Sequence, residues 1–451
     1  MTRRPAILIA LLALFLSIPP ARADGPAALV VVTGDQHSAY ERTAQVVAAV
    51  DRLKAAHPGL PIAILLDGDT LEQGNPVARR GAGAVDFAMF AALARRAPTV
   101  VNLGNHETEF GSLEETVRRI EATGARVVSN IDDRATGRPA ASTSTRLALG
   151  AIEAVVVGVA TSDLSTYPEA VRPSLRLPDP VAWARASLPA LLDAAPVKIV
   201  LSHAGLQADR GLLPLVPDGA LVAGAHDHLR FVQRFGRTVY VHSGAWNAFL
   251  TLAWLHRDAA GAMRWDVEQI PIADDAPADP ELAALIRDAA EKHLTPADRE
   301  VVARLPAALA PAGAARAVTG ALRRGLDVDA VLIGNTTFGG GLPAGEVTRA
   351  AFDACVRFDG GIFTATVDGA RLRRLLASAN QGPDTPFDQR GGEYLVADGP
   401  AAIDTAKRYR IATNDWGARN SARYFGDPVI DWRELPGTRL KATVLRALAR
   451  R

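Results

Sequence analysis

Seven oxygen- and nitrogen-bearing side chains, drawn from five separate segments, form a mix of residue types that is typical of metal ligands. Each segment places an aspartate, an asparagine or a histidine just after a short apolar run. The side chains are Asp35, His37, Asp69, Asn105, His203, His226 and His228. Carboxylate, amide and imidazole donors in this combination suit two hard or borderline divalent cations, with Mn, Zn, Fe and Co all admissible. We therefore predict a binuclear metal site and, with it, a hydrolase.

The apolar runs that precede these residues predict the β-strands that must position them. The clearest runs cover residues 28–32, 62–66 and 199–201. Side chains two residues apart on an extended segment point to one face. Asp35 and His37 can therefore address one site from one strand end, and His226 and His228 can do the same. Because neighbouring strands end at a common edge of a sheet, we expect all the donors to meet there.

The order of predicted strands and helices indicates an α/β protein. Short runs rich in Val, Ile and Leu alternate with helical stretches, which favours α/β layers over an all-helical or all-β fold. Residues 238–255 indicate a hairpin or two successive strands, and a connector helix should run from Glu281 to about Arg304. We predict a first domain over residues 24–272, an acidic and proline-rich break with this connector over residues 273–312, and a smaller α/β domain over residues 313–451.

The first residues predict export. Two arginines precede an apolar stretch from Ala6 to Ile18, which is shorter than the ~20 residues of a membrane-spanning helix. A small-x-small cleavage site follows at Ala21–Ala23, so residues 1–23 have the pattern of a cleavable signal peptide. We therefore expect a periplasmic or secreted protein with no stable membrane insertion after cleavage.

Composition narrows the function further. The 451 residues include 50 Lys and Arg against 49 Asp and Glu, a formal net charge of +1, without basic runs. This balance gives no electrostatic reason to expect nucleic acid as a partner. Cys355 is the only cysteine, so the chain forms no intramolecular disulfide and offers little basis for a thiol mechanism.

Five short motifs carry a resemblance to a known family. They are Asp35-x-His37, Gly68-Asp69, Gly104-Asn105-His106-Glu107, Ser202-His203 and His226-x-His228. In this order they resemble the motifs of calcineurin-like metallophosphoesterases. Over nearly its whole length the chain is similar to bacterial periplasmic 5′-nucleotidases and UDP-sugar hydrolases. The resemblance implies a four-layer αββα sandwich followed by a smaller α/β substrate-recognition domain that closes over the metals.

The resemblance also implies how the donors are shared between the metals. It assigns one ion to Asp35, His37 and His228, the other to Asn105, His203 and His226, and the bridging role to Asp69. Two cations ~3.5–4 Å apart can hold a bridging hydroxide for in-line attack on phosphorus. We therefore expect a reaction without a covalent enzyme intermediate.

His106 is the candidate catalytic group, since it adjoins the ligand Asn105 and can protonate the leaving oxygen or stabilise the transition state. In the family, an aspartate three residues later orients this histidine, whereas this chain has Glu109. One extra methylene can still reach an imidazole nitrogen. We therefore predict Glu109 as the orienting partner.

Three residues of the second domain are candidates for substrate binding. Phe358 and Trp416 fall where the family clamps a nucleotide base between two aromatic rings, and Asn335 is retained from another family motif. The polar contacts differ, because the family's base-contacting asparagine falls on Gly360 and its ribose-binding aspartate on Ala422. The sequence therefore supports the metal chemistry better than it supports a nucleotide substrate.

The leading prediction is an exported dinuclear-metal phosphohydrolase, a 5′-nucleotidase-like phosphomonoesterase acting on a small organic phosphate. One alternative keeps the metals and changes the bond to a phosphodiester, a nucleotide-sugar pyrophosphate or a thiosulfonate ester. Another is a non-catalytic binding protein that retains the fold. The sequence leaves the metal's identity, the substrate and the oligomeric state open.

Overall fold

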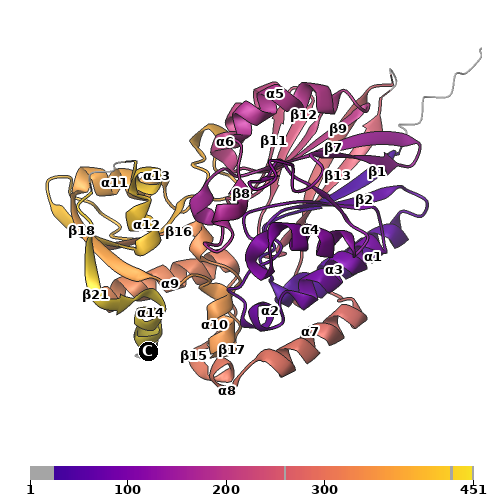
Figure 1. The fold of residues 1–451 in the computed structure, drawn as a ribbon. Helices are drawn as coiled ribbons and strands as arrows, with labels where there is room; N and C mark the ends of the chain where they lie inside the picture. The colour runs from indigo at the N-terminus through magenta and orange to yellow at the C-terminus, as the bar shows by residue number, and fades with distance from the viewer. Residues whose placement is uncertain (1–24, 259–260, 427–429, 449–451) are drawn as a thin grey trace, which may run out of the picture.

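The larger domain is built on two stacked sheets of six strands each (Figure 1). The computed structural model describes residues 25–258, 261–426 and 430–448. The predicted signal peptide, residues 1–23, lies outside the described residues. Within the described ranges, no helix combines the length and the apolar character that a membrane crossing requires.

The first sheet is mixed, with four parallel strands followed at one edge by two antiparallel ones. In sheet order its strands are β14 (Met263–Pro271), β13 (Phe249–Arg257), β1 (Ala28–Thr33), β2 (Ile62–Asp67), β3 (Thr99–Asn102) and β4 (Arg126–Val128). Strands β1 to β4 are parallel to one another, and β13 and β14 are antiparallel to their neighbours. Every residue of β1, β2 and β3 is buried, which explains their continuous apolar sequences.

The second sheet is also mixed, with one antiparallel strand at each edge. In sheet order its strands are β11 (Arg230–Phe235), β12 (Thr238–Ser243), β10 (Leu221–Gly224), β9 (Val197–His203), β7 (Ile152–Ala160) and β6 (Ser144–Leu149). The four inner strands are parallel, and β11 and β6 flank them in the antiparallel sense. Apolar side chains such as Val30, Leu65, Val156 and Ile199 fill the space between the two sheets.

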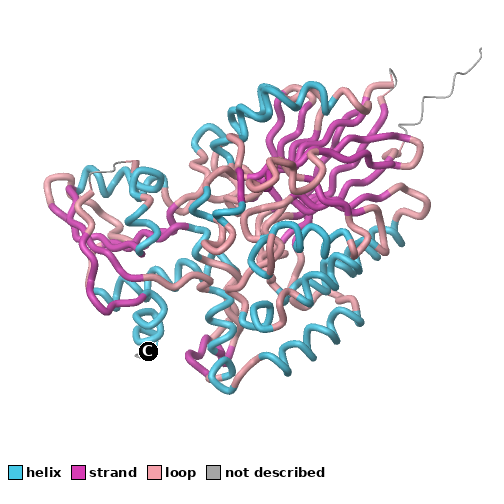
Figure 2. The backbone as a smooth tube through the Cα atoms, viewed as in Figure 1, coloured by secondary structure: helices cyan, strands magenta, loops and turns pink. Residues whose placement is uncertain are grey.

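Helices cover the outer face of each sheet. Packed against the first sheet are α1 (Tyr40–Ala56), α3 (Ala84–Ala94) and α4 (Leu113–Glu121), and α7 (Pro280–His293) packs on the outer side of α1 and α3. Packed against the second sheet are α5 (Pro180–Leu192) and α6 (Leu206–Leu212). Figure 2 shows the strands stacked between these two helical layers. The predicted four-layer αββα sandwich is therefore confirmed.

A smaller α/β domain follows, at the left in Figure 1. Its sheet has the order β19 (Leu395–Asp398), β16 (Ala330–Gly334), β20 (Arg408–Asn414), β18 (Gly361–Asp368) and β21 (Arg433–Arg439). One core contains side chains from α9 (Pro311–Leu326), α10 (Arg349–Cys355) and α14 (Leu440–Leu448). A second core contains side chains from α11 (Gly369–Ser378) and α13 (Ser421–Phe425).

One local expectation differs from the structure, and the structure decides one alternative that the sequence left open. The connector helix ends at His293, because Pro296 lacks an amide hydrogen and instead opens the short helix α8 (Pro296–Arg299), which Thr295 caps. Strand β15 (Val301–Leu305) then pairs with β17 (Gly345–Thr348). The region 238–255 forms two successive strands and no hairpin, because β12 joins the second sheet and β13 the first.

Candidate metal centre

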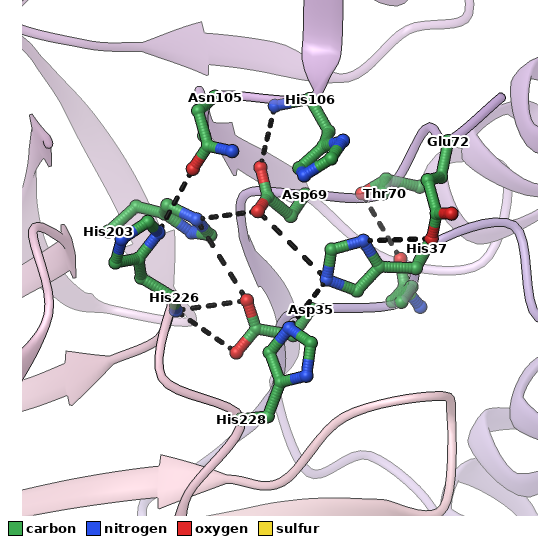
Figure 3. A network of polar contacts seen from close by, with 12 residues as sticks. Asp35, His37, Asp69, Thr70, Glu72, Asn105, His106, His203, His226 and His228 are labelled. Atoms are coloured by element: carbon green, nitrogen blue, oxygen red, sulfur yellow. Dashed lines mark hydrogen bonds and ion pairs between the residues drawn. The ribbon is translucent and has the colours of Figure 1, made fainter. Parts of the chain in front are cut away.

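The seven predicted donors converge where parallel strands of both sheets reach their carboxyl ends (Figure 3). Each of β1, β2, β3 and β10 delivers its donors within a few residues of the strand end, whereas β9 ends on a donor. Asp35 and His37 follow β1, Asp69 follows β2, Asn105 follows β3, His226 and His228 follow β10, and His203 is the last residue of β9. Sheet topology therefore brings together residues that are up to 193 positions apart, from residue 35 to residue 228.

One group of donors contains Asp35, His37 and His228, whose ligand atoms lie within 4.8 Å of one another. The Nε2 atoms of the two imidazoles face each other at 2.9 Å. Both Asp35 oxygens accept the backbone N–H of His226, at 2.9 and 3.0 Å. The Asp35 carboxylate is thus fixed between the two groups.

The second group contains Asp69, His203 and His226, with Asn105 beside it. His203 Nε2 lies 3.0 Å from Asp69 Oδ2, and His226 Nδ1 lies 3.0 Å from Asn105 Oδ1. The same Asp69 oxygen is 4.0 Å from His37 Nε2, so this carboxylate lies between the groups. Burial acts to raise the pKa of Asp69, but His203 and His106 outweigh it and hold the pKa well below its usual range.

The donor set fits divalent cations. His203 Nε2 is buried and, although Asp69 Oδ2 lies 3.0 Å away, forms no well-aligned hydrogen bond among the described residues, while its Nδ1 is held 2.7 Å from the carbonyl oxygen of Asp67. A ring nitrogen held in this way directs the other toward a metal. The remaining donors are imidazole nitrogens and carboxylate or amide oxygens, which together suit borderline cations such as Zn and Mn.

Most of the donors have left-handed backbone conformations. The φ angles are 50° at Asp35, 49° at His37, 52° at Asp69, 80° at His226 and 57° at His228. This region costs a residue with a Cβ atom roughly 1–2 kcal/mol. Aspartate and histidine are among the side chains that tolerate it best. The chain therefore holds these donors in strained conformations that the surrounding packing maintains.

Two glycines give the donors their room. A Cβ atom on Gly104 would lie 2.3 Å from Asp69 Oδ1 and 2.6 Å from the Asp69 nitrogen. A Cβ atom on Gly68, whose φ is 73°, would lie 2.5 Å from His203 Nδ1. Both positions need close backbone approach, and Gly68 also needs a left-handed turn.

Two buried glutamates support the centre, although sequence reasoning gave neither a role. Glu72 Oε2 lies 3.3 Å from His37 Nδ1. Glu107 accepts backbone N–H groups of Asp69, Thr70 and Gly104 at 2.9, 2.7 and 2.7 Å. Glu107 lies within a recognised motif, which was the available signal. Nothing near Glu72 in the sequence indicates its partner.

The candidate catalytic pair is in contact. His106 Nδ1 and Glu109 Oε1 form a short hydrogen bond, and the other Glu109 oxygen accepts the backbone N–H of Gln73. Burial acts to lower the pKa of His106, but the carboxylates of Asp69 and Glu109 outweigh it and raise the pKa to about 10. The longer side chain of Glu109 therefore reaches the imidazole and leaves Nε2 available to a substrate.

A cavity of about 340 Å³ lies over the donors, between the two domains. His106, Phe358 and Trp416 all line it. The rings of His106 and Phe358 are 6.2 Å apart between centroids, and Trp416 Nε1 donates to the Tyr424 hydroxyl at 3.1 Å. The two predicted aromatic positions therefore face the same space.

Asn335 lies elsewhere. It lines a neighbouring interdomain cavity of about 470 Å³. Its amide nitrogen donates to the Asp227 carbonyl oxygen and its amide oxygen accepts the Tyr394 N–H, both at 2.9 Å. The Asn335 side chain therefore joins the two domains beside the histidine pair.

At the position of the family's asparagine, the chain has Gly360, which lies against Asp415. A Cβ atom on Gly360 would lie 2.1 Å from Asp415 Oδ1, so the Asp415 carboxylate fills the space beside this glycine. Asp415 in turn accepts a hydrogen bond from Arg419 at 2.6 Å. One wall of the cavity therefore carries a carboxylate–guanidinium pair together with Phe358 and Trp416.

The comparisons with known proteins agree with this geometry. Residues 28–243 match the model of the family described as Calcineurin-like phosphoesterase. This stretch contains all seven donors, His106 and Glu109. None of the curated protein sequences matches the chain.

Solved structures match nearly the whole chain at low identity. Sulfate thiohydrolase SoxB of Thermus thermophilus is 17% identical with a TM-score of 0.66, covering 94% of this chain and 94% of that one. A 5′-nucleotidase precursor, also of Thermus thermophilus, is 16% identical with a TM-score of 0.63, covering 94% and 96%. The 5′-nucleotidase of Candida albicans is 13% identical with a TM-score of 0.63, covering 95% and 98%. At these identities the likeness establishes the fold of both domains.

Proposed function

We propose a function from the premise that residues 28–243 of this chain form a calcineurin-like phosphoesterase domain and that the protein is a metal-dependent hydrolase of phosphate esters. Its specific activity, on this proposal, is that of a dinuclear-metal phosphomonoesterase resembling the 5′-nucleotidases. The observation that carries the proposal is the position of Asp69 between the two groups of donors.

Asp35, His37 and His228 would hold one cation, Asn105, His203 and His226 the other, and Asp69 would contact both. When bound, the cations would supply Lewis-acid stabilisation of the phosphate oxygens and activation of the attacking water. The donor set does not distinguish among Mn, Zn, Fe and Co, because all four cations accept these ligands.

The protein's own contribution centres on His106. Glu109 holds Nδ1, so Nε2 is the nitrogen that faces the cavity and can donate a proton to the leaving oxygen. Because the carboxylate is itself fixed by the Gln73 N–H, the imidazole is held in place before the substrate arrives.

The proposed substrate is a small organic phosphate. A cavity of about 340 Å³ is within the usual range for small-molecule sites. Phe358 and Trp416 could stack a flat leaving group between them, which keeps a nucleotide among the candidates. The pair formed by Asp415 and Arg419 offers hydrogen-bonding groups of its own.

A second candidate keeps the metal centre and changes the bond to a thiosulfonate ester. The observation that favours it is the likeness of both domains to the sulfate thiohydrolase SoxB, at a TM-score of 0.66. The departure at Gly360 is compatible with either substrate.

Export and domain roles complete the proposal. The arginines and apolar stretch within residues 1–23 support a cleaved signal peptide and a periplasmic or secreted enzyme. Residues 24–272 would act as the hydrolase domain, residues 273–312 as the break and connector, and residues 313–451 as the substrate-recognition domain. Sequencing the N-terminus of protein recovered from the periplasm or medium tests the cleavage near Ala23.

A substrate panel on purified, Mn²⁺-loaded mature protein tests the activity. We expect turnover of AMP or another monoester to exceed that of UDP-glucose, a cyclic nucleotide, bis-p-nitrophenyl phosphate and a thiosulfonate ester. Asp69→Ala and His226→Ala should abolish turnover while circular dichroism stays unchanged, and Asp193→Ala, an exposed aspartate, serves as the control. Good diester turnover without monoester turnover would overturn the choice of bond. Fewer than one metal ion per chain, with no hydrolysis, would favour a binding protein.

A further inference from the structure

Arg357 of the smaller domain reaches into the larger one and ends beside the metal centre. It precedes Phe358 in the chain but, unlike Phe358, does not line the cavity over the donors. Its Nε and Nη2 lie 3.2 and 3.1 Å from Glu72 Oε2, and Nη2 also donates to the His37 carbonyl oxygen. The side chains of Arg357 and Glu72 are 2% and 0% exposed. This ion pair is therefore fully buried at the domain interface.

The oxygen of Glu72 that receives Arg357 also contacts a proposed metal ligand. Glu72 Oε2 is 3.3 Å from His37 Nδ1, and the other nitrogen of that ring faces His228 and Asp69. A line of contacts thus runs from the smaller domain through one carboxylate to one ligand (Figure 3 shows its Glu72–His37 part).

Neighbouring residues leave room for the Arg357–Glu72 ion pair and pack around it. A Cβ atom on Gly74 would lie 2.0 Å from Glu72 Oε1, and one on Gly339 would lie 2.8 Å from Arg357 Cγ. The Trp246 ring lies 5.0 Å from the Arg357 guanidinium carbon and 4.6 Å from the His37 ring centroid. Glycines from both domains and one aromatic ring therefore enclose the contact.

A buried charge pair of this kind calls for a reason other than stability. Taking two charges out of water offsets most of what their attraction contributes, so a buried ion pair is weak evidence for a stabilising role. A carboxylate on the far nitrogen of a metal-binding imidazole, in contrast, fixes the tautomer and the ring orientation. Arg357 holds that carboxylate in place from the other domain.

We propose that Arg357 is a positioning residue: through Glu72 it sets the orientation of the His37 imidazole, so that docking of the smaller domain and cation binding at Asp35, His37 and His228 are thermodynamically linked. The inference rests on the proposed metal centre. Linkage is reciprocal, so the domain contact strengthens cation binding and the cation strengthens the domain contact by the same factor.

Titration of metal-free protein with Mn²⁺ by calorimetry tests the first half of this linkage. We expect two binding events in the wild type. In Arg357→Met, one of them should weaken by roughly 10–100-fold, the usual effect of losing a partner behind a metal ligand. Arg357→Lys, which keeps the charge, should recover part of the loss. If Arg357→Met fails to fold with a stranded Glu72, the double variant Arg357→Met/Glu72→Gln removes both charges and should show the same weakening.

Arg210 supplies the matched control. It is also an interdomain arginine, donating to the carbonyl oxygens of Phe387 and Arg390 at 2.8 Å, but it touches no proposed ligand. Arg210→Ala should leave both Mn²⁺ affinities unchanged. An equal weakening in Arg210→Ala would mean that general loosening of the interface is the cause, and would overturn the proposal.

Hydrogen exchange tests the reciprocal half. In the wild type, Mn²⁺ should slow exchange of the amides of residues 355–360, and in Arg357→Met this slowing should be lost. Wild-type affinity and wild-type exchange in a folded Arg357→Met would overturn the positioning role and leave the metal centre standing. Failure of the wild type itself to bind Mn²⁺ would overturn both proposals.

Discussion

At the scale of single residues, the contact between His106 and Glu109 is the clearest departure from the family pattern. The 3-10 turn Glu107–Phe110 follows directly after His106 and places the side chains of residues i and i+3 on one side. One Glu109 oxygen meets the imidazole and the other meets the Gln73 N–H. The backbone here is therefore arranged for glutamate, and the shorter aspartate would not span both contacts.

Glu109→Ala should lower kcat on a monoester by about 100-fold with little change in KM, because a misplaced imidazole costs rate more than affinity. Glu109→Asp should be impaired as well. Metal content, measured by mass spectrometry, should stay at the wild-type level, and the exposed Glu114→Gln variant provides the control. Wild-type kcat in Glu109→Ala would remove the orienting role.

The seven proposed metal ligands could be predicted from the sequence, but the residues that contact and support them could not. Aspartate, asparagine and histidine at strand ends carry their chemistry in their residue type, and those seven side chains do converge. Glu72 and Trp246 had no such signal, because their roles depend on contacts with His37 from distant parts of the chain. Phe358 and Trp416 face the cavity, while Asn335 joins the domains, so their substrate-binding roles remain predictions.

At the scale of elements, a buried polar network ties the ends of β9 and β12 to helix α6. The Tyr240 hydroxyl lies 2.6 Å from Asp209 Oδ2 and 2.6 Å from His242 Nε2, and Asp209 also accepts from the Ser202 hydroxyl. Ser202 immediately precedes the donor His203. The network therefore fixes the strand end from which an imidazole reaches the centre.

Tyr240→Phe should lower the free energy of unfolding by about 1–3 kcal/mol, because it removes the hydrogen-bond partner of two buried atoms, Asp209 Oδ2 and His242 Nε2. Urea denaturation followed by far-ultraviolet circular dichroism measures the change. Tyr409→Phe, at a hydroxyl that accepts an exposed N–H, should stay within about 0.5 kcal/mol of the wild type. Equal stability of the two variants would contradict this account of the network.

The sequence predicted whether most segments are helices or strands, but it did not predict which strands pair in a sheet. Fully apolar runs such as residues 62–66 and 330–334 are strands in the structure, because their side chains are buried on both faces. The region 238–255 left open whether its strands pair, because nothing local assigns β12 and β13 to different sheets. The connector was expected to stay helical past Pro296, although a proline there favours a new helix start.

At the scale of the whole molecule, the donors come from both sheets of the sandwich. Asp35, His37, Asp69 and Asn105 follow strands of the first sheet, while His203 ends a strand of the second sheet and His226 and His228 follow another. Bound cations would therefore join the two sheets at their open edge, and the interdomain contacts of Arg357 and Asn335 lie against the same loops. Metal binding should be coupled to global stability.

Removing the metals with a chelator should lower the melting temperature, and Mn²⁺ at a hundredfold excess over its Kd should restore about 2.7 kcal/mol per site. Differential scanning calorimetry across a Mn²⁺ series measures the dependence. Mg²⁺, which prefers all-oxygen octahedral sites, should be less effective at equal concentration. A melting temperature independent of Mn²⁺ would mean that cation binding at the metal centre does not stabilise the folded protein.

The left-handed conformations of five donors limit how this enzyme could be redesigned. Exchanging one of them for cysteine or glutamate, in order to favour a different cation, would add a steric penalty to any gain in coordination. Among side chains that can bind a cation, aspartate, asparagine and histidine are the ones that best tolerate the backbone conformation at those positions. Directed libraries should therefore diversify residues 105 and 203, whose backbones are unconstrained in this sense, before the other five.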